Sequence, residues 1–254
     1  MFNLKFKAMK KNVFFALIML TAGFAAGQKQ NVTEVEVTAP QFTGIENVLN
    51  EKAMPGNSLR NYLIENISYP ERATKCFNEG TEVVQFTVTA GGNVTDFKII
   101  NSVCTDIDDE MIRVLKNTNG KWLPGYNNGK PVDMTKEVSL AFILNNESGK
   151  TAGEIFTEKA KYSFASGNKN LFEKHNIGKA LKNFSAGLNY LPYDKSLLLM
   201  RGICRFEIGD AEGAKQDWNR MATLGGALDM SEYTTQIAGL KGYDELMDIL
   251  KNTF

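Results

Sequence analysis

The sequence predicts an α+β protein in which a small domain of three strands and one helix precedes an all-helical region. Within residues 81–144, two alternating strand patterns, one helical pattern and a third strand pattern follow one another. From Gly153 onward the apolar spacing is helical, and part of it recurs further along the chain. A chain of 254 residues, 43% hydrophobic and 23% charged, can bury two modest cores of this kind.

Residues 1–27 have the pattern of a secretory signal peptide. Lys5, Lys7, Lys10 and Lys11 precede an apolar run of roughly 14 residues, and small residues follow at 25–27. A bilayer-spanning helix needs about 20 residues, so a short retained anchor is the alternative. Cleavage would leave 25 basic against 29 acidic residues, a balance that disfavours nucleic acid as a partner. We expect a periplasmic protein or, if the segment is retained, an inner-membrane anchored one facing the periplasm.

Residues 28–57 are interpreted as a leader or linker. Val32, Val35 and Val37 partly alternate in it, which is compatible with a short edge strand or an extended arm. The next segment, 58–66, has helical spacing, with Asn57 or Ser58 as its cap. We expect the first folded domain to span residues 58–146.

The strand patterns are clearest in residues 81–101. Val84, Phe86 and Val88 alternate with mostly polar residues, the signature of a half-buried strand. Residues 90–93, Ala-Gly-Gly-Asn, predict a tight hairpin to a return strand at 94–101. A helix is expected from Asp106, a turn-rich connection over 122–131, and a last strand over 135–144.

The predicted helix start is rich in acids, because Asp106, Asp108, Asp109 and Glu110 all lie in its first turn. Such a cluster could hold a metal, but it also suits the positive end of the helix dipole. We interpret it as helix stabilisation and expect no metal site.

Several motifs in this order resemble the C-terminal domain of TonB, in the form common in Bacteroidetes. They are Tyr69-Pro70, the strand 81–88 after Gly80, Ile107-Asp108, Trp122-Leu123-Pro124-Gly125 and Asn128-Gly129-Lys130-Pro131-Val132. The resemblance covers less than a third of the chain, and Glu82 stands where the family usually has valine. It implies a small ββαβ TonB C-terminal-like domain that binds outer-membrane transporters, without enzymatic activity.

In that family the last strand is an exposed edge that pairs with an extended segment of the transporter, a case of β-augmentation. Carried over to this chain, the resemblance implies a partner-binding edge made of Thr135, Lys136, Glu137, Val138, Ser139, Leu140, Ala141 and Phe142. The alternative is that the leader or the helical region covers this edge. The family's energy transducers also carry a membrane-segment histidine and a long Pro-rich rod, whereas the single histidine here is His175.

Three cysteines, Cys76, Cys104 and Cys204, allow at most one intramolecular bridge. Cys76 and Cys104 flank the first two predicted strands and could pair in an oxidising periplasm. The alternative is that both are small buried hydrophobic residues.

The helical region, residues 153–254, carries the spacing of tetratricopeptide-like repeats. Ala180, Phe184 and Gly187 recur one repeat later as Ala214, Trp218 and Met221. Gly167 and Gly209 are expected to end the first helix of each copy. This matching requires an insertion of about eight residues around 168–176 in the first copy, and residues 231–250 are expected to supply capping helices. Such arrays bind protein partners in a concave face, so a second partner is expected there unless the helices only pack on the sheet.

No set of residues in the sequence assembles a nucleophile, a base and an orienting group. Ser148-Gly149-Lys150-Thr151 imitates a phosphate-binding loop, but Leu144 occupies the position of its first glycine. We therefore expect no enzyme activity and no cofactor. The leading hypothesis is a TonB-type protein-binding module associated with outer-membrane transport. The alternative is a secreted envelope scaffold that binds partners through its helical repeats.

Overall fold

The computed structural model describes residues 36–44, 58–144, 149–225 and 231–253. The expected signal segment and most of the expected leader lie outside these ranges, as does Asn57, one of the two expected caps. Within them, no helix is both long and apolar enough to cross a membrane.

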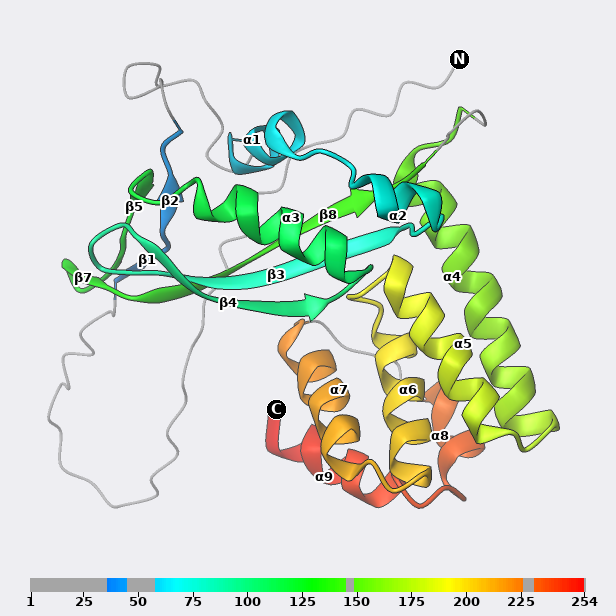
Figure 1. Ribbon diagram of the computed structural model, residues 1–254. Coiled ribbons are helices and arrows are strands. Elements are labelled where there is room, and N and C mark those ends of the chain that lie inside the picture. Colours follow the sequence, from blue (N-terminus) through cyan, green and yellow to red (C-terminus); the bar gives the residue numbers. More distant parts are fainter. Residues whose placement is uncertain (1–35, 45–57, 145–148, 226–230, 254) are drawn as a thin grey trace, which may run out of the picture. The chain divides into compact units, whose positions relative to one another are not determined.

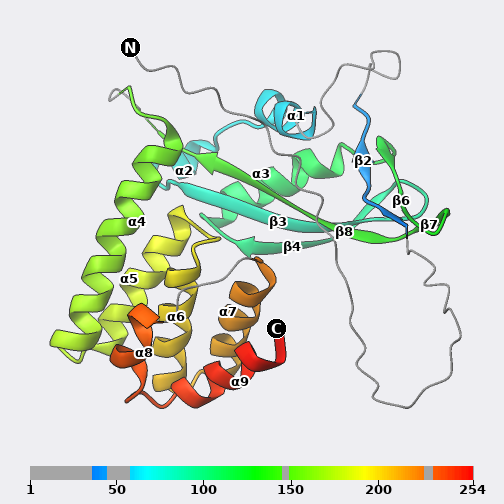
Figure 2. The same ribbon diagram turned by 180° about the vertical axis from the view of Figure 1, so that it is seen from behind.

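The main sheet has three antiparallel strands, β3 (Gly80–Val88), β4 (Val94–Asn101) and β8 (Met134–Phe142). Their order is β4-β3-β8, so β3 lies in the middle, as Figure 2 shows. The β3 to β8 register runs without a break from Gly80 opposite Phe142 to Val88 opposite Met134. The β3 to β4 register shifts twice, once between Val83 and Val84 and once between Gln85 and Thr87.

Helices α1 (Ser58–Asn66), α2 (Glu71–Lys75) and α3 (Thr105–Lys116) lie on one side of this sheet (Figure 1). The core between helix and sheet follows the expected periods. Helix α3 buries residues at spacings of three and four, and strand β3 buries alternate ones. These residues are Ile107, Met111, Val114 and Leu115 on α3, and Val84, Phe86 and Val88 on β3.

Five short strands complete this part of the fold. They are β1 (Val37–Thr38), β2 (Gln41–Phe42), β5 (Trp122–Leu123), β6 (Gly125–Asn127) and β7 (Lys130–Val132). Strand β1 pairs with β6, which pairs with β7, and β2 pairs with β5. The connection expected to be rich in turns is therefore strand-paired, because residues 37–42 of the leader supply partners for β5 and β6. Trp122 is 5% exposed and contacts Phe42 and Phe86, so it closes this end of the core.

The helical region consists of α4 (Ala152–Asn168), the π-helical turn η1 (Lys169–Glu173), α5 (Ile177–Tyr190), α6 (Lys195–Glu207), α7 (Ala211–Thr223), α8 (Ser231–Ile237) and α9 (Tyr243–Thr253). Thr151, the last residue of the segment that imitates a phosphate-binding loop, caps α4 in a capping box with Glu154. A core separate from that of the sheet fills the space between these helices.

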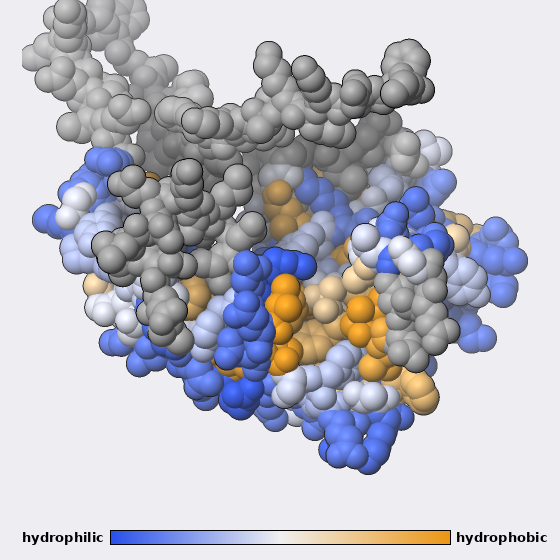
Figure 3. Space-filling view, turned by 90° about the horizontal axis from the view of Figure 1, so that it is seen from above, coloured by the Kyte–Doolittle hydropathy of each residue, from blue (hydrophilic) through white to orange (hydrophobic). Residues whose placement is uncertain are grey.

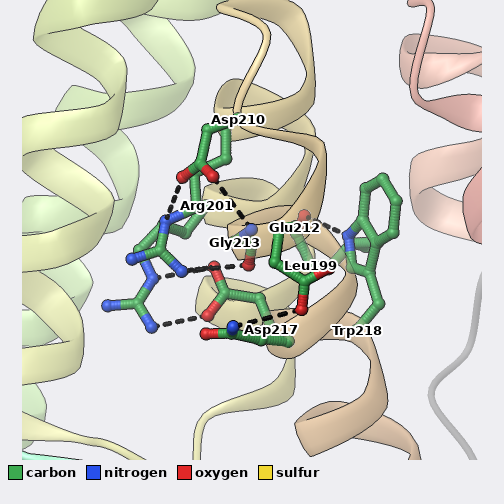
Figure 4. Close-up of polar contacts among 9 residues, drawn as sticks. Leu199, Arg201, Asp210, Glu212, Gly213, Asp217 and Trp218 are labelled. Carbon is green, nitrogen blue, oxygen red and sulfur yellow. Dashed lines mark hydrogen bonds and ion pairs between the residues drawn. The ribbon is translucent and has the colours of Figure 1, made fainter.

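Two successive helix pairs, α4 with α5 and α6 with α7, use the same close contact. A Cβ on Gly167 would come closer than 3.0 Å to the Phe184 ring, and one on Gly202 closer than 3.0 Å to the Trp218 ring. Glycine therefore lets the helices of each pair approach around a large ring. In the second pair, Trp218 also donates a hydrogen bond to the Leu199 carbonyl, at 3.2 Å (Figure 4).

The expected insertion of about eight residues after Gly167 is wrong, and the π-helical turn η1 lies in this segment instead. Along the sequence, the separation of Gly167 from Phe184 exceeds that of Gly202 from Trp218 by only one position. A π-helical turn takes up one residue more than an α-helical turn, and η1 begins just after Gly167. The next turn then matches in both pairs, because His175 and Gly209 have positive φ and the residue after each caps the second helix. The helical region thus fits two repeats of nearly equal length.

The helical region contacts the face of the main sheet that α3 does not cover. Thr81 on β3 donates its hydroxyl to the Tyr190 carbonyl at 2.7 Å, and the Asn189 side chain donates to the Glu79 carbonyl at 2.8 Å. Val83, whose side chain is fully buried, belongs to neither hydrophobic core cluster. Since Val83 alternates with the α3-facing residues of β3, we place it on the face that the helices cover.

Candidate functional site: the β8 edge

Strand β8 forms one edge of the main sheet, because it pairs with β3 on one side only. Its bounds, Met134–Phe142, contain every residue of the expected partner-binding edge. In the described part of the chain, no strand pairs with its other side. An edge strand of this length exposes backbone donors and acceptors that another strand can use.

Two hydrogen bonds at the ends of β3 show which β8 backbone groups face outward. The Thr89 amide donates to the Asn93 carbonyl in the hairpin, and the Asn101 side chain donates to the Thr81 carbonyl. The backbone groups of the odd-numbered residues around β3 therefore point toward β4, and those of the even-numbered residues toward β8.

The unbroken register extends this alternation to β8. Lys136, Val138, Leu140 and Phe142 lie opposite even-numbered β3 residues, so their backbone groups face β3. The residues opposite odd-numbered positions present their amide and carbonyl groups to the outside: Thr135, Glu137, Ser139 and Ala141. Half of the expected binding edge can thus hydrogen-bond a partner strand, and the other half holds β8 in the sheet.

The β8 residues whose backbone groups face β3 also point their side chains into the core between the sheet and α3. Leu140 is 7% exposed and Phe142 is 3% exposed, and both belong to that core cluster. The Tyr69 ring packs edge-on against Phe142, with centroids 5.6 Å apart. Burial raises the pKa of Tyr69 to about 12, so its hydroxyl stays neutral and donates to the Asn78 carbonyl. These contacts make the even-numbered residues structural.

Lys136 is the polar exception on this face. Its ammonium donates to the Pro40 carbonyl at 3.1 Å and lies 5.8 Å from the centroid of the Trp122 ring. Burial lowers the pKa of Lys136. Residues 37–42 of the leader therefore lie near the α3 side of β8 at this residue, while pairing with β5 and β6 rather than with β8.

The outward-pairing half of β8 meets the helical region through Glu137. Its carboxylate accepts two hydrogen bonds from the Arg220 guanidinium of α7, at 2.7 and 2.5 Å. The same guanidinium lies 5.4 Å from the centroid of the Tyr193 ring. Burial, followed by the neighbouring Glu137 carboxylate, raises the pKa of Tyr193 to about 12. Sequence reasoning missed Arg220 and Tyr193, because no local pattern relates them to a strand so much earlier in the chain.

Glu82 is a second feature of the sheet that the sequence did not explain. Its side chain is fully buried, and one carboxyl oxygen accepts the Val103 amide at 2.9 Å. Its other oxygen has no hydrogen-bond partner among the described residues. Burial raises the pKa of Glu82 to about 8, and the nearby Asp108 adds to this shift. The carboxyl is therefore mainly protonated at neutral pH.

The acids at the start of α3 are divided among different contacts. Asp106 lies 3.8 Å from Arg72, Asp108 accepts the Ser102 hydroxyl, and Glu110 binds both Arg113 and Ser68. Hydrogen bonds from Arg113 lower the pKa of Glu110 to about 2. The described part of the chain contains no group of three or more His, Cys, Asp or Glu side chains placed to hold a metal ion.

The cysteines do not add to the site. Cys76 is exposed at the end of α2, Cys104 is half-buried at the N-terminus of α3, and Cys204 is buried. All three are free thiols in the structure, and the pairing of Cys76 with Cys104 stays a prediction. His175 is exposed in the turn before α5.

Exposed apolar residues gather on the face that carries α1 and α2 (Figure 3). Hydrophobic side chains gather near the middle of this view, and Ile64 on α1 and Phe77 after α2 are 54% and 81% exposed. No feature of the described residues indicates an occupant for this surface, so we assign no site to it.

Comparison with known proteins bears on the strand-rich part of the chain, an α+β domain with a three-stranded antiparallel sheet and one long covering helix. Residues 65–144 match the family model described as Gram-negative bacterial TonB protein C-terminal. No curated protein matches the chain. One solved structure, the NMR structure of the Helicobacter pylori TonB C-terminal domain (residues 179–285), is 18% identical, covers 39% of this chain and 90% of its own, and has a TM-score of 0.29.

The match to the TonB C-terminal family is confined to residues 65–144 of this chain, and a helical region that fits repeats follows them. Domains of this family are non-enzymatic and associated with transport. They interact with outer-membrane transporters or other envelope proteins, which indicates a periplasmic or envelope location. The expected family resemblance and the expected α+β fold are confirmed.

Proposed function

We propose that this chain is a periplasmic protein-binding module of the TonB type, associated with TonB-dependent outer-membrane transport. It takes up an extended segment of its partner by β-augmentation on β8. Thr135, Glu137, Ser139 and Ala141 supply the backbone hydrogen bonds, and the even-numbered residues between them keep β8 in the sheet. The module requires no cofactor.

The observation that carries the proposal is the open side of β8. Its outward amide and carbonyl groups follow one another at every second residue, and no described strand pairs with them. A strand that docks there gains main-chain hydrogen bonds whatever its sequence, while alternate side chains set its selectivity. The family match supports an envelope protein as the source of this strand.

Substitution of Ser139 by proline tests the proposal. Proline removes one outward amide, and edge strands tolerate it where that amide does not join the ladder. We expect Ser139→Pro to remain folded and to lose binding of fluorescent fifteen-residue peptides that match the N-terminal periplasmic segments of outer-membrane transporters. Fluorescence anisotropy measures the binding, and circular dichroism checks the fold.

Ser139→Ala is the matched control, since it changes the same side chain and keeps the amide. Leu140 is unsuitable for this test, because it is buried and its backbone faces β3. If Ser139→Pro is folded and binds the peptides as the unchanged chain does, β-augmentation on β8 is wrong. The partner would then be sought on the helical repeats, as in the scaffold alternative.

A further inference from the structure

The helical region places two side chains beside the outward half of β8. Arg220 on α7 holds the Glu137 carboxylate, and Tyr193 lies between α5 and α6 with its ring against the Arg220 guanidinium. Glu137 and Ser139 both lie close enough to Tyr193 to act on its pKa, Glu137 raising it and Ser139 lowering it. The outward-pairing residues of β8 thus share one face of the sheet with a wall built from another part of the chain.

A strand added to β8 would bring its own side chains to this wall. Residues directly opposite one another on neighbouring strands project from the same face of a sheet, with Cβ atoms about 5 Å apart. Partner residues opposite Glu137 and Ser139 therefore project toward Tyr193 and Arg220. The partner residues between them project to the α3 side and do not meet the wall.

The chemistry of the wall selects an uncharged side chain. Both Glu137 oxygens pair with the two terminal nitrogens of Arg220, with side chains 21% and 23% exposed, while Arg220 Nε has no partner among the described residues. A cation in the partner would compete with Arg220 for Glu137, and an anion would compete with Glu137 for Arg220. Truncating or competing for one half of a partly buried ion pair leaves the other charge without a partner, which is costly. Tyr193 is 38% exposed and offers a ring surface that an apolar side chain can cover.

We propose that Tyr193 and Arg220 form a specificity wall for the strand bound by β8, and that the wall selects apolar side chains at alternate positions of that strand. This inference rests on the proposed function and extends it, because both residues lie outside the segment 65–144 that matches the family. The occupant is an extended peptide segment of an envelope partner whose alternate residues are apolar.

A lysine scan of the bound peptide tests the wall. The probe is the tightest-binding of the fifteen-residue transporter peptides, synthesised with lysine at each position in turn. Against the unchanged chain, we expect lysine to weaken binding by about tenfold at one or two peptide positions. If there are two, they are both odd-numbered or both even-numbered in the peptide. A loss of this size is typical of residues in contact. Against Tyr193→Ala, we expect the original peptide to bind about threefold to tenfold more weakly and the lysine penalty at those positions to shrink.

Two variants control the experiment. Tyr193→Phe keeps the ring and should preserve the pattern. Tyr162→Ala removes another exposed tyrosine, on α4 and outside the wall, and should change nothing. If Ser139→Pro abolishes binding but the lysine pattern is the same for the unchanged chain and for Tyr193→Ala, the wall is wrong and β-augmentation stands. If Ser139→Pro leaves binding intact, both proposals fail.

Discussion

Glu82 is a single residue that couples this sheet to pH. Its carboxyl is buried on the middle strand, and one of its oxygens has no partner among the described residues. Burial raises its pKa to about 8. Glutamate in an unfolded chain has a pKa of about 4.3, so unfolding changes the proton affinity of this group.

The direction of the pH dependence follows from that difference. Between about pH 4.5 and pH 8 the folded state holds a proton on Glu82 that the unfolded state releases, so the free energy of unfolding falls as pH rises. The contribution is complete below about pH 4.5, declines by at most about 1.4 kcal/mol per pH unit, and is lost above the folded pKa. We expect Glu82→Gln to flatten this slope, as measured by urea denaturation at several values between pH 5 and pH 8.

Glu110 provides an internal comparison for this measurement. Its pKa is lowered to about 2, so its contribution to stability is present above the ordinary glutamate pKa and is lost only in acid. Glu110→Gln should leave the slope between pH 5 and pH 8 unchanged. Equal slopes for the unchanged chain and Glu82→Gln would show that Glu82 ionises normally in the folded protein.

His175 has a backbone conformation that its side chain does not favour. Its φ is 50°, and its structural counterpart in the second repeat is Gly209, with φ of 91°. The left-handed region costs residues with a Cβ about 1 kcal/mol relative to glycine. We therefore expect His175→Gly to raise the free energy of unfolding by up to about 1 kcal/mol, whereas His175→Ala should give no such gain. Urea denaturation separates the two, and equal stabilities would contradict the assigned strain.

At the scale of elements, the helix pairs depend on two close contacts. A Cβ on Gly202 would come closer than 3.0 Å to the buried Trp218 ring, which cannot move away without disturbing the core between α6 and α7. We expect Gly202→Ala to destabilise the protein by about 1 to 3 kcal/mol, as overpacking does. Thermal unfolding followed by circular dichroism measures the loss.

Gly153 supplies the matched control, because it lies in the first turn of α4 and a Cβ there would meet nothing closer than 3.9 Å. Gly153→Ala should be neutral or slightly stabilising, since alanine favours helix. A Gly202→Ala variant as stable as Gly153→Ala would mean that α6 and α7 are packed less closely than the structure has them.

The elements that the sequence predicts well are those with a strong local period. Apolar and polar residues alternate in 81–88, and apolar residues recur every three or four positions in α3. Strands β3, β4 and β8 and helix α3 are therefore expected near their observed bounds. Strands β5, β6 and β7 are missed, because such short strands carry little period and the pairing of β5 and β6 depends on the distant leader. The π-helical turn is missed because the spacing of the repeats matches Gly167 with Gly209, whereas in the structure Gly167 occupies the position of Gly202.

The site could be predicted only as far as the resemblance reached. It led us to expect a binding edge on the strand that is β8, but it did not distinguish outward-pairing from inward-pairing residues, since that alternation depends on the register with β3. The Arg220 contact to Glu137 joins residues 83 positions apart, and no sequence pattern predicts such a pair. Arg220 and Tyr193, which lie outside residues 65–144, could therefore be identified only from the structure.

At the scale of the whole described molecule, the main sheet has covered faces on both sides. Helix α3 covers one face, and contacts from the helical region cover the other, where Val83 is fully buried. A sheet face that packs against a second layer loses its buried apolar contacts when that layer is removed. The helical region would then serve the strand-rich domain as a structural layer as well as a specificity wall.

Removal of residues 153–254 tests this dependence. Exposing Val83 alone costs about 1.5 to 3 kcal/mol, and Glu137 and Thr81 also lose their partners from the helical region. We expect the shortened chain to unfold at a clearly lower urea concentration than the sheet of the full chain, followed through the fluorescence of Trp122 in a Trp218→Phe background. The double variant Glu137→Gln, Arg220→Gln keeps the layer without the ion pair and should lose no more than about 1 kcal/mol, because partly exposed pairs contribute little. A shortened chain as stable as the full one would show that the TonB-type domain folds independently, and the contacts of α5 and α7 would then matter only for the partner strand.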